Sequence, residues 1–171
     1  MNNSKILDFL TVAAEYCACV ERVEHSQKKD FIETTHKIVC LLYLKTSLLP
    51  FNEDVDGFCE QFVTEDDWNF IQSSVAQKLG DHDIFISIQE PDTYESGETI
   101  SVNLSECFAD IYQDIRDCIE RYRIGKAEMQ ELAIYDCVMH FKTYWGQRAL
   151  ALVAEMHNLL YSPHIVLTND E

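Results

Sequence analysis

The chain has 171 residues, 47% of them apolar and 25% charged, so it can bury a sizeable core without a metal or disulfide. It carries 30 acidic and 13 basic side chains, a formal net charge of −17. This charge repels phosphate backbones and anionic lipid, so we expect no nucleic-acid and no membrane partner. A basic protein partner is compatible with it, although solubility is the simpler explanation of the charge.

The seven cysteines are scattered and contain no Cys-x-x-Cys pair, which is typical of a reducing compartment. Asp8 and Glu15 interrupt the first apolar stretch, which argues against a signal peptide. No uncharged run approaches the length that spans a bilayer. The expected location is therefore the cytoplasm.

Only five glycines and three prolines are present, which favours long helices. Apolar residues repeating at three and four predict a first helix from about Ser4 to Glu24. A second helix is predicted from a cap at Ser26 to about Ser47. Its second half, Ile38–Leu44, is almost wholly apolar and is predicted to be a central strut surrounded by other helices.

The third predicted helix has the clearest local signature. Thr64 stands at the cap with Asp67 three residues later, close to a capping box. Val63 and Trp68 occupy the two positions of a hydrophobic staple, and Gly80 marks the end of the helix.

Residues 84–102 lack the helical spacing of three and four. Apolar residues there alternate with a period of two. Ile84, Ile86 and Ile88 alternate with Phe85 and Ser87, and residues 99–102 are again rich in β-branched side chains. A small hairpin is predicted here, with an ordered extended loop as the alternative.

Helix is predicted to resume at Asn103, where Glu106 completes an Asn-x-x-Glu capping box, and to end at Gly125. The last helix is predicted from Lys126 to Leu160, with a bend or break at Gly146. The fold class is therefore all-α or mainly α: a bundle of about five helices forming one domain, residues 1–161. Residues 162–171 are predicted to be a flexible acidic tail.

Three blocks occur in order along the chain: Phe62-Val-Thr-Glu-Asp-Asp-Trp68 continuing to Leu79-Gly-Asp-His-Asp83, then Ala109-Asp-Ile-Tyr-Gln-Asp-Ile115, then Phe141-Lys-Thr-Tyr-Trp-Gly-Gln147. They resemble a family of uncharacterised bacterial proteins classed only as a domain of unknown function. The resemblance implies an all-helical bundle with a short irregular or β insertion, a bacterial cytoplasm and no assigned activity.

The family pattern commonly has His just before the Trp-Gly pair and again two residues after it. This chain has Tyr144 and Arg148 there, so a metal or acid–base role for such histidines does not carry over to it.

Two patterns resemble metal sites and are better explained otherwise. Glu33 and His36 have the Glu-x-x-His spacing of di-iron bundles, but the motif occurs once and such a bundle needs it twice. Asn52–Gly57 begins like a calcium loop, yet the twelfth position is Val63 instead of a bidentate Glu. We therefore expect no metal and no cofactor, and an acidic linker at 52–57.

Asp110, Asp114 and Asp117 share one helical face, as a divalent-cation site would require. Because Arg121 follows Asp117 by four residues, as in a surface ion pair, a solvated acidic face is the preferred interpretation.

Asp136 and His140 are four residues apart on the last helix, a spacing at which a carboxylate can orient an imidazole. The alternative is a helix-surface hydrogen bond or a polar seam between helices. No motif places a nucleophile beside them, so no catalytic residue is assigned.

Gly146, inside the same helix, is expected to be there because a neighbour packs where a Cβ would lie. The preferred ligand-binding residues surround it: Tyr144, Trp145, Arg148, His140 and Asp136.

Two functions follow as hypotheses. The first is a non-catalytic, cytosolic protein-interaction module, favoured by the charge, the helices and the missing catalytic motifs. The alternative is a small-molecule- or metal-binding helical domain, and so a possible small enzyme, with a pocket around the last helix.

Overall fold

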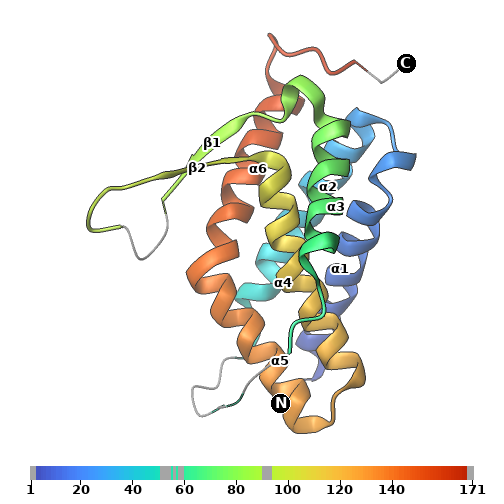
Figure 1. Cartoon of the computed structure of the whole chain (residues 1–171), viewed down its shortest axis with the longest axis vertical. Helices are drawn as coiled ribbons and strands as arrows, with labels where there is room; N and C mark the ends of the chain where they lie inside the picture. The colour runs from blue at the N-terminus through green and yellow to red at the C-terminus, as the bar shows by residue number, and fades with distance from the viewer. Residues whose placement is uncertain (1–2, 51–54, 56, 58–59, 90–93, 169–171) are drawn as a thin grey trace.

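The computed structural model describes residues 3–50, 55, 57, 60–89 and 94–168 of the chain. Its helices run side by side in one bundle, with a small hairpin on one flank (Figure 1). The first half contains α1 (Asn3–Glu21), a 3-10 turn (Val23–His25), α2 (Lys28–Ser47), α3 (Glu65–Leu79) and a second 3-10 turn (Gly80–His82). The second half contains β1 (Phe85–Ile88), β2 (Ile100–Asn103), α4 (Leu104–Ile124), α5 (Ala127–His140), a π-helical turn (Phe141–Trp145) and α6 (Gly146–Tyr161). The predicted fold class, helical with a small hairpin, is confirmed.

The central helix of the bundle is α4, which packs against α1, α3, α5 and α6. The prediction that Ile38–Leu44 of α2 is the central strut is wrong. Helix α2 packs mainly on α1 and α6, and on its outer side Leu41 is 43% exposed and Leu44 52% exposed. An apolar run indicates what a helix can bury, but which sides are covered depends on the helices that pack around it.

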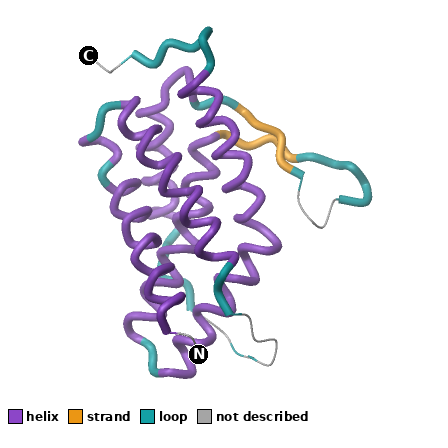
Figure 2. Tube along the Cα trace, turned by 180° about the vertical axis from the view of Figure 1, so that it is seen from behind, coloured by secondary structure: helices purple, strands orange, loops and turns teal. Residues whose placement is uncertain are grey.

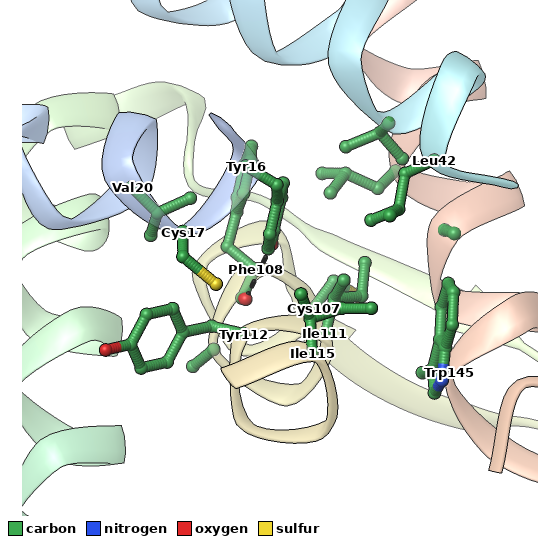
Figure 3. Packing of buried hydrophobic residues seen from close by; sticks show 14 of the residues in the cluster. Tyr16, Cys17, Val20, Leu42, Cys107, Phe108, Ile111, Tyr112, Ile115 and Trp145 are labelled. Carbon is green, nitrogen blue, oxygen red and sulfur yellow. Dashed lines mark hydrogen bonds between the residues drawn. The ribbon is translucent and has the colours of Figure 1, made fainter. Parts of the chain in front are cut away.

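Large aromatic side chains from three helices fill the core (Figure 3). Tyr16 of α1 is fully buried, and its hydroxyl donates a hydrogen bond of 2.8 Å to the backbone carbonyl of Phe108 on α4. Trp145 is also fully buried. Because the phenol finds a backbone acceptor, Tyr16 contributes apolar area to the core without an unpaired polar group.

The local signals for helix ends were accurate with one exception. Thr64 and Asp67 form the predicted capping box, and Gly80 ends α3 with a φ of 55°. The exception is Ser26: α2 is capped by Gln27, because the Ser26 hydroxyl donates instead to the carbonyl of Val23 in the preceding 3-10 turn.

The predicted hairpin is confirmed as two antiparallel strands, in which Ile86 faces Val102 and Ile88 faces Ile100. Ile88 is buried and β1 contacts α6, so one face of the hairpin packs on the bundle. Helix α4 then starts directly after β2, where the backbone N–H of Asn103 donates to the Glu106 carboxylate at 2.8 Å, one of the two hydrogen bonds of the predicted capping box.

The long last helix contains a π-turn at the predicted irregularity. The N–H of Gly146 donates to the carbonyl of Phe141, five residues back instead of four. A Cβ on Gly146 would overlap that carbonyl oxygen and lie 3.2 Å from two carbons of the Phe141 ring. The expected close neighbour at Gly146 is therefore confirmed. It is the carbonyl of Phe141, the acceptor of the π-helical hydrogen bond.

Helix α1 begins at one end of the bundle, and residues 162–168 lie at the other (Figure 2). Within this last segment Ile165 and Leu167 are partly buried against the core. Among the described residues, every helix is too short or too polar to cross a bilayer.

Candidate functional site

The acidic residues of α4 are partly or fully buried and paired, so the predicted solvated acidic face is wrong. The side chains of Asp110, Asp114 and Asp117 are 12%, 14% and 6% exposed. Each forms a short polar contact with a residue that follows α4 in the chain or with the segment before α3. These three carboxylates form a polar seam inside the bundle, where a buried charge is tolerated only with a partner.

The first carboxylate, Asp110, accepts hydrogen bonds from side chains on α3 and α6. The indole N–H of Trp68 donates to its Oδ1 at 3.0 Å, and Nε of Arg148 donates to its Oδ2 at 2.7 Å. The Arg148 guanidinium also lies 3.8 Å from the centre of the Tyr144 ring. Asp110 thus connects α3 to α6 and fixes Arg148 beneath Tyr144.

Asp117 holds the segment before α3 against α4. Its Oδ1 accepts the backbone N–H groups of Phe62 and Val63, both at 2.8 Å, and its Oδ2 lies 3.4 Å from Arg121. Arg121 in turn donates to the carbonyl of Glu60 at 2.7 Å and to Asp136 at 2.5 Å. The expected surface pair is therefore a buried ion cluster that secures residues 60–63.

His140 pairs with Asp114. The helical spacing had instead suggested a pair with Asp136. The Nδ1 of His140 lies 2.5 Å from Oδ1 of Asp114, 26 residues away on α4. Its Nε2 is 3.9 Å from Asp136, too far for a hydrogen bond. Asp136 is instead bound by Arg121, whose guanidinium carries a permanent charge.

This pairing changes the titration of both groups. The hydrogen bond to Asp114 raises the pKa of His140, against the opposing effect of burial. Burial raises the pKa of Asp114, while the bond to His140 opposes that rise. A raised folded-state pKa means that His140 contributes its stability below the unfolded value and loses it as pH rises through the folded value.

We expect NMR titration of the ring protons to place the pKa of His140 above that of an ordinary histidine and the pKa of His36 below it. Burial, followed by the nearby His157, lowers the pKa of His36. Asp114→Asn should lower the pKa of His140 and leave that of His36 unchanged. If the two histidines titrate in the opposite order, the assigned Asp114–His140 pair is incorrect.

A polar cleft of about 430 Å³ opens beside this pair, between α4 and the α5–π segment. The side chains that line it all carry hydrogen-bonding groups: Gln61, Gln113, Asp114, Asp117, Arg121, His140, Thr143 and Tyr144. His140 is half exposed. The π-turn follows His140 directly and contributes Thr143 and Tyr144, so the irregular stretch of helix forms one wall.

The five residues predicted from sequence divide into three groups around this cleft. Tyr144 and His140 line it, whereas Asp136 and Arg148 do not but hold lining residues through their contacts. Trp145 is buried in the core, where its indole N–H donates to the carbonyl of Cys137 at 3.3 Å. Its predicted need for an acceptor is thus met away from the cleft.

Sequence reasoning missed six of the lining residues: Gln61, Gln113, Asp114, Asp117, Arg121 and Thr143. The pattern of three acids on α4 did identify the correct face. Its interpretation failed because the imidazole that pairs with Asp114 and the two backbone N–H groups bound to Asp117 come from residues far away in the chain.

The two other patterns that resemble metal sites in the sequence gain no support from the described residues. Glu33 pairs with Lys37 at 2.8 Å, as an exposed surface bridge. No group of three or more His, Cys, Asp or Glu side chains within the described part of the chain is placed to hold a metal ion. Only Val55 and Gly57 of the calcium-like stretch 52–57 are described, so that prediction lies outside the described residues.

Comparison with known proteins identifies relatives without assigning an activity. A family model described as a domain of unknown function (DUF5063) matches residues 2–162. The crystal structure of a structural-genomics target protein from Bacteroides fragilis is similar, with 35% sequence identity and a TM-score of 0.81. The similarity covers 95% of this chain and 96% of that one. No curated protein matches.

Proposed function

The chain belongs to this family of domains of unknown function, and we propose that it binds a small polar molecule in the cleft beside His140. The observation that carries the proposal is the π-turn. A π-turn replaces regular helical hydrogen bonds with a less favourable pattern and is frequent at functional sites. Here it borders the cleft and contributes Thr143 and Tyr144 to the wall.

The charges of the cleft favour a neutral or cationic ligand. Asp114 and Asp117 line it and Asp136 adjoins it, against the cation Arg121 and the imidazole of His140, whose pKa is raised by its hydrogen bond to Asp114. The charged groups are already paired with one another, and the chain as a whole carries −17, which disfavours the approach of an anion. The ligand would therefore be recognised by hydrogen bonds from the side-chain amides of Gln61 and Gln113 and from the outer nitrogen of His140.

The lining supports binding more than nucleophilic catalysis. The described lining residues include neither Ser nor Cys, and the Thr143 hydroxyl donates to the carbonyl of Met139 within its own helix. The phenol of Tyr144 is protonated at neutral pH, as an ordinary tyrosine is, and burial raises its pKa further. These are the groups of a recognition site.

A bacterial cytoplasm is the setting we propose for this binding. The six cysteines among the described residues are free thiols, as a reducing compartment maintains them. The relative of known structure comes from a bacterium. The net charge of −17 supports a role without nucleic acid.

A thermal-shift screen tests the proposal with a panel of polyols, amino acids and primary amines, and with dicarboxylates as the disfavoured class. We expect at least one neutral or cationic compound to raise the melting temperature saturably, because a ligand of the folded state stabilises it. The shift should be lost in Thr143→Leu and His140→Gln and kept in His157→Gln, an exposed histidine elsewhere on α6. A shift that survives both cleft variants would place the ligand elsewhere and overturn the proposal.

A further inference from the structure

The outward side of the β1–β2 hairpin is apolar and open, and it is independent of the cleft. Side chains alternate along β1, so Ile88 is buried toward α6 while Phe85, on the opposite face, is 71% exposed. Beyond the strands, Tyr94 is also exposed. Figure 1 shows the hairpin extending from the flank of the bundle, away from the neighbouring helices.

The register identifies which backbone groups of β1 face outward. The N–H of Leu104 donates to the carbonyl of Ile84 at 3.3 Å, which makes this a hydrogen-bonded position of the ladder. Such positions alternate in an antiparallel pair, so Ile86 and Ile88 bond to β2. The N–H and C=O groups of Phe85 and Ser87 therefore point to the outer edge of β1.

This four-residue edge strand lacks two of the devices with which proteins usually protect an edge, a charged side chain and a proline. Residues 85–88 read Phe-Ile-Ser-Ile and contain no charged residue and no proline. An uncharged edge next to an exposed aromatic ring can accept another strand, whose backbone completes the ladder.

Charge decides which kind of strand the edge accepts. The sequence contains neither Lys nor Arg between Lys78 and Arg116, while the described residues in and around the hairpin include four acids: Asp81, Asp83, Glu95 and Glu98. A second copy of the chain would bring the same acids against this region and be repelled. A basic segment would be attracted.

We propose that the outer edge of β1 binds an extended, basic segment of another protein as a third strand. Main-chain hydrogen bonds to Phe85 and Ser87 supply the ladder, the Phe85 ring packs on an apolar side chain of the segment, and Lys or Arg side chains face the acidic hairpin.

The test measures fluorescence anisotropy of a labelled nine-residue peptide in which Lys and Val alternate. Two further peptides serve as controls, one with Glu in place of Lys and one with Pro in place of alternate Val residues. We expect binding of the Lys–Val peptide to the full chain, with both control peptides at least about tenfold weaker.

Ser87 and Ser101 provide a matched pair of edge variants. They face each other across the ladder, both are exposed, and neither bonds to the opposite strand in this register. Proline at either position thus removes an outward N–H while leaving the hairpin ladder intact. Ser87→Pro should weaken peptide binding about tenfold, whereas Ser101→Pro, on the β2 edge, should change it by less than about twofold.

Phe85→Ser gives a second variant that needs no proline, and circular dichroism verifies that each variant is folded. Equal binding of the Lys and Glu peptides, or equal effects of the two proline variants, would overturn the proposal. So would sedimentation showing that the chain self-associates through Phe85. Loss of the cleft ligand in Thr143→Leu would leave this result unaffected, so the two proposals fail separately.

Discussion

Asp117→Ala is expected to destabilise the fold by about 3–5 kcal/mol, the usual consequence of removing one partner from a buried ion pair. The substitution leaves the N–H groups of Phe62 and Val63 without their acceptor and Arg121 with Asp136 as its remaining carboxylate partner in the cluster. Unpaired buried donors and a less compensated buried cation both cost free energy. Urea denaturation followed by circular dichroism measures the loss.

Two further variants separate the contributions. Asp117→Asn retains an oxygen acceptor for the two amides but lacks the charge, so its loss should be smaller than that of alanine. Glu15→Ala, an exposed acid in the middle of α1, should change stability by no more than about 0.5 kcal/mol. The effect of Asp117→Ala combined with Arg121→Met should be less than the sum of the single losses, because the two side chains share one cluster. A loss below about 1 kcal/mol for Asp117→Ala would contradict the buried cluster.

Gly146→Ala is expected to lower the free energy of unfolding by about 1–3 kcal/mol, as overpacking does. In an ordinary exposed helix the same change raises stability by about 1 kcal/mol, because alanine has the higher helix propensity. Here the added methyl overlaps the Phe141 carbonyl, a backbone atom that cannot turn aside as a side chain can. Relief requires the π-turn to rearrange, which would also move Thr143 and Tyr144 in the wall of the cleft.

Ala154→Gly is the matched control, since Ala154 is exposed on α6. It should cost about 1 kcal/mol from propensity alone. Adding a methyl group at Gly146 and removing one at Ala154 would thus both lower the stability of the fold. A gain in stability for Gly146→Ala would show that the π-turn adapts at little cost and would remove the main support for the cleft proposal.

Local sequence determined where most elements begin and end. The Thr64–Asp67 capping box, the glycine at position 80 and the period of two over residues 84–88 were all interpreted correctly. Each depends on interactions within about four residues or on the strand pleat, so the neighbouring sequence contains most of the energy involved. Gly146 belongs to this group as well. A glycine inside an otherwise good helix implies a close neighbour, and that neighbour is a carbonyl of the same helix.

The tertiary structure alone decided the partners of the polar residues. His140 has Asp136 one turn away, yet it bonds to Asp114 on a different helix because Arg121 binds Asp136. The acids of α4 were expected to face solvent. Because each of them pairs with a group from another segment, they form a buried seam instead. Asp114, Asp117 and Asp136 carry identical side chains, so local sequence cannot distinguish them. Only the packing of α5 and α6 against α4 determines which cation each one meets and how much water is excluded around the pair.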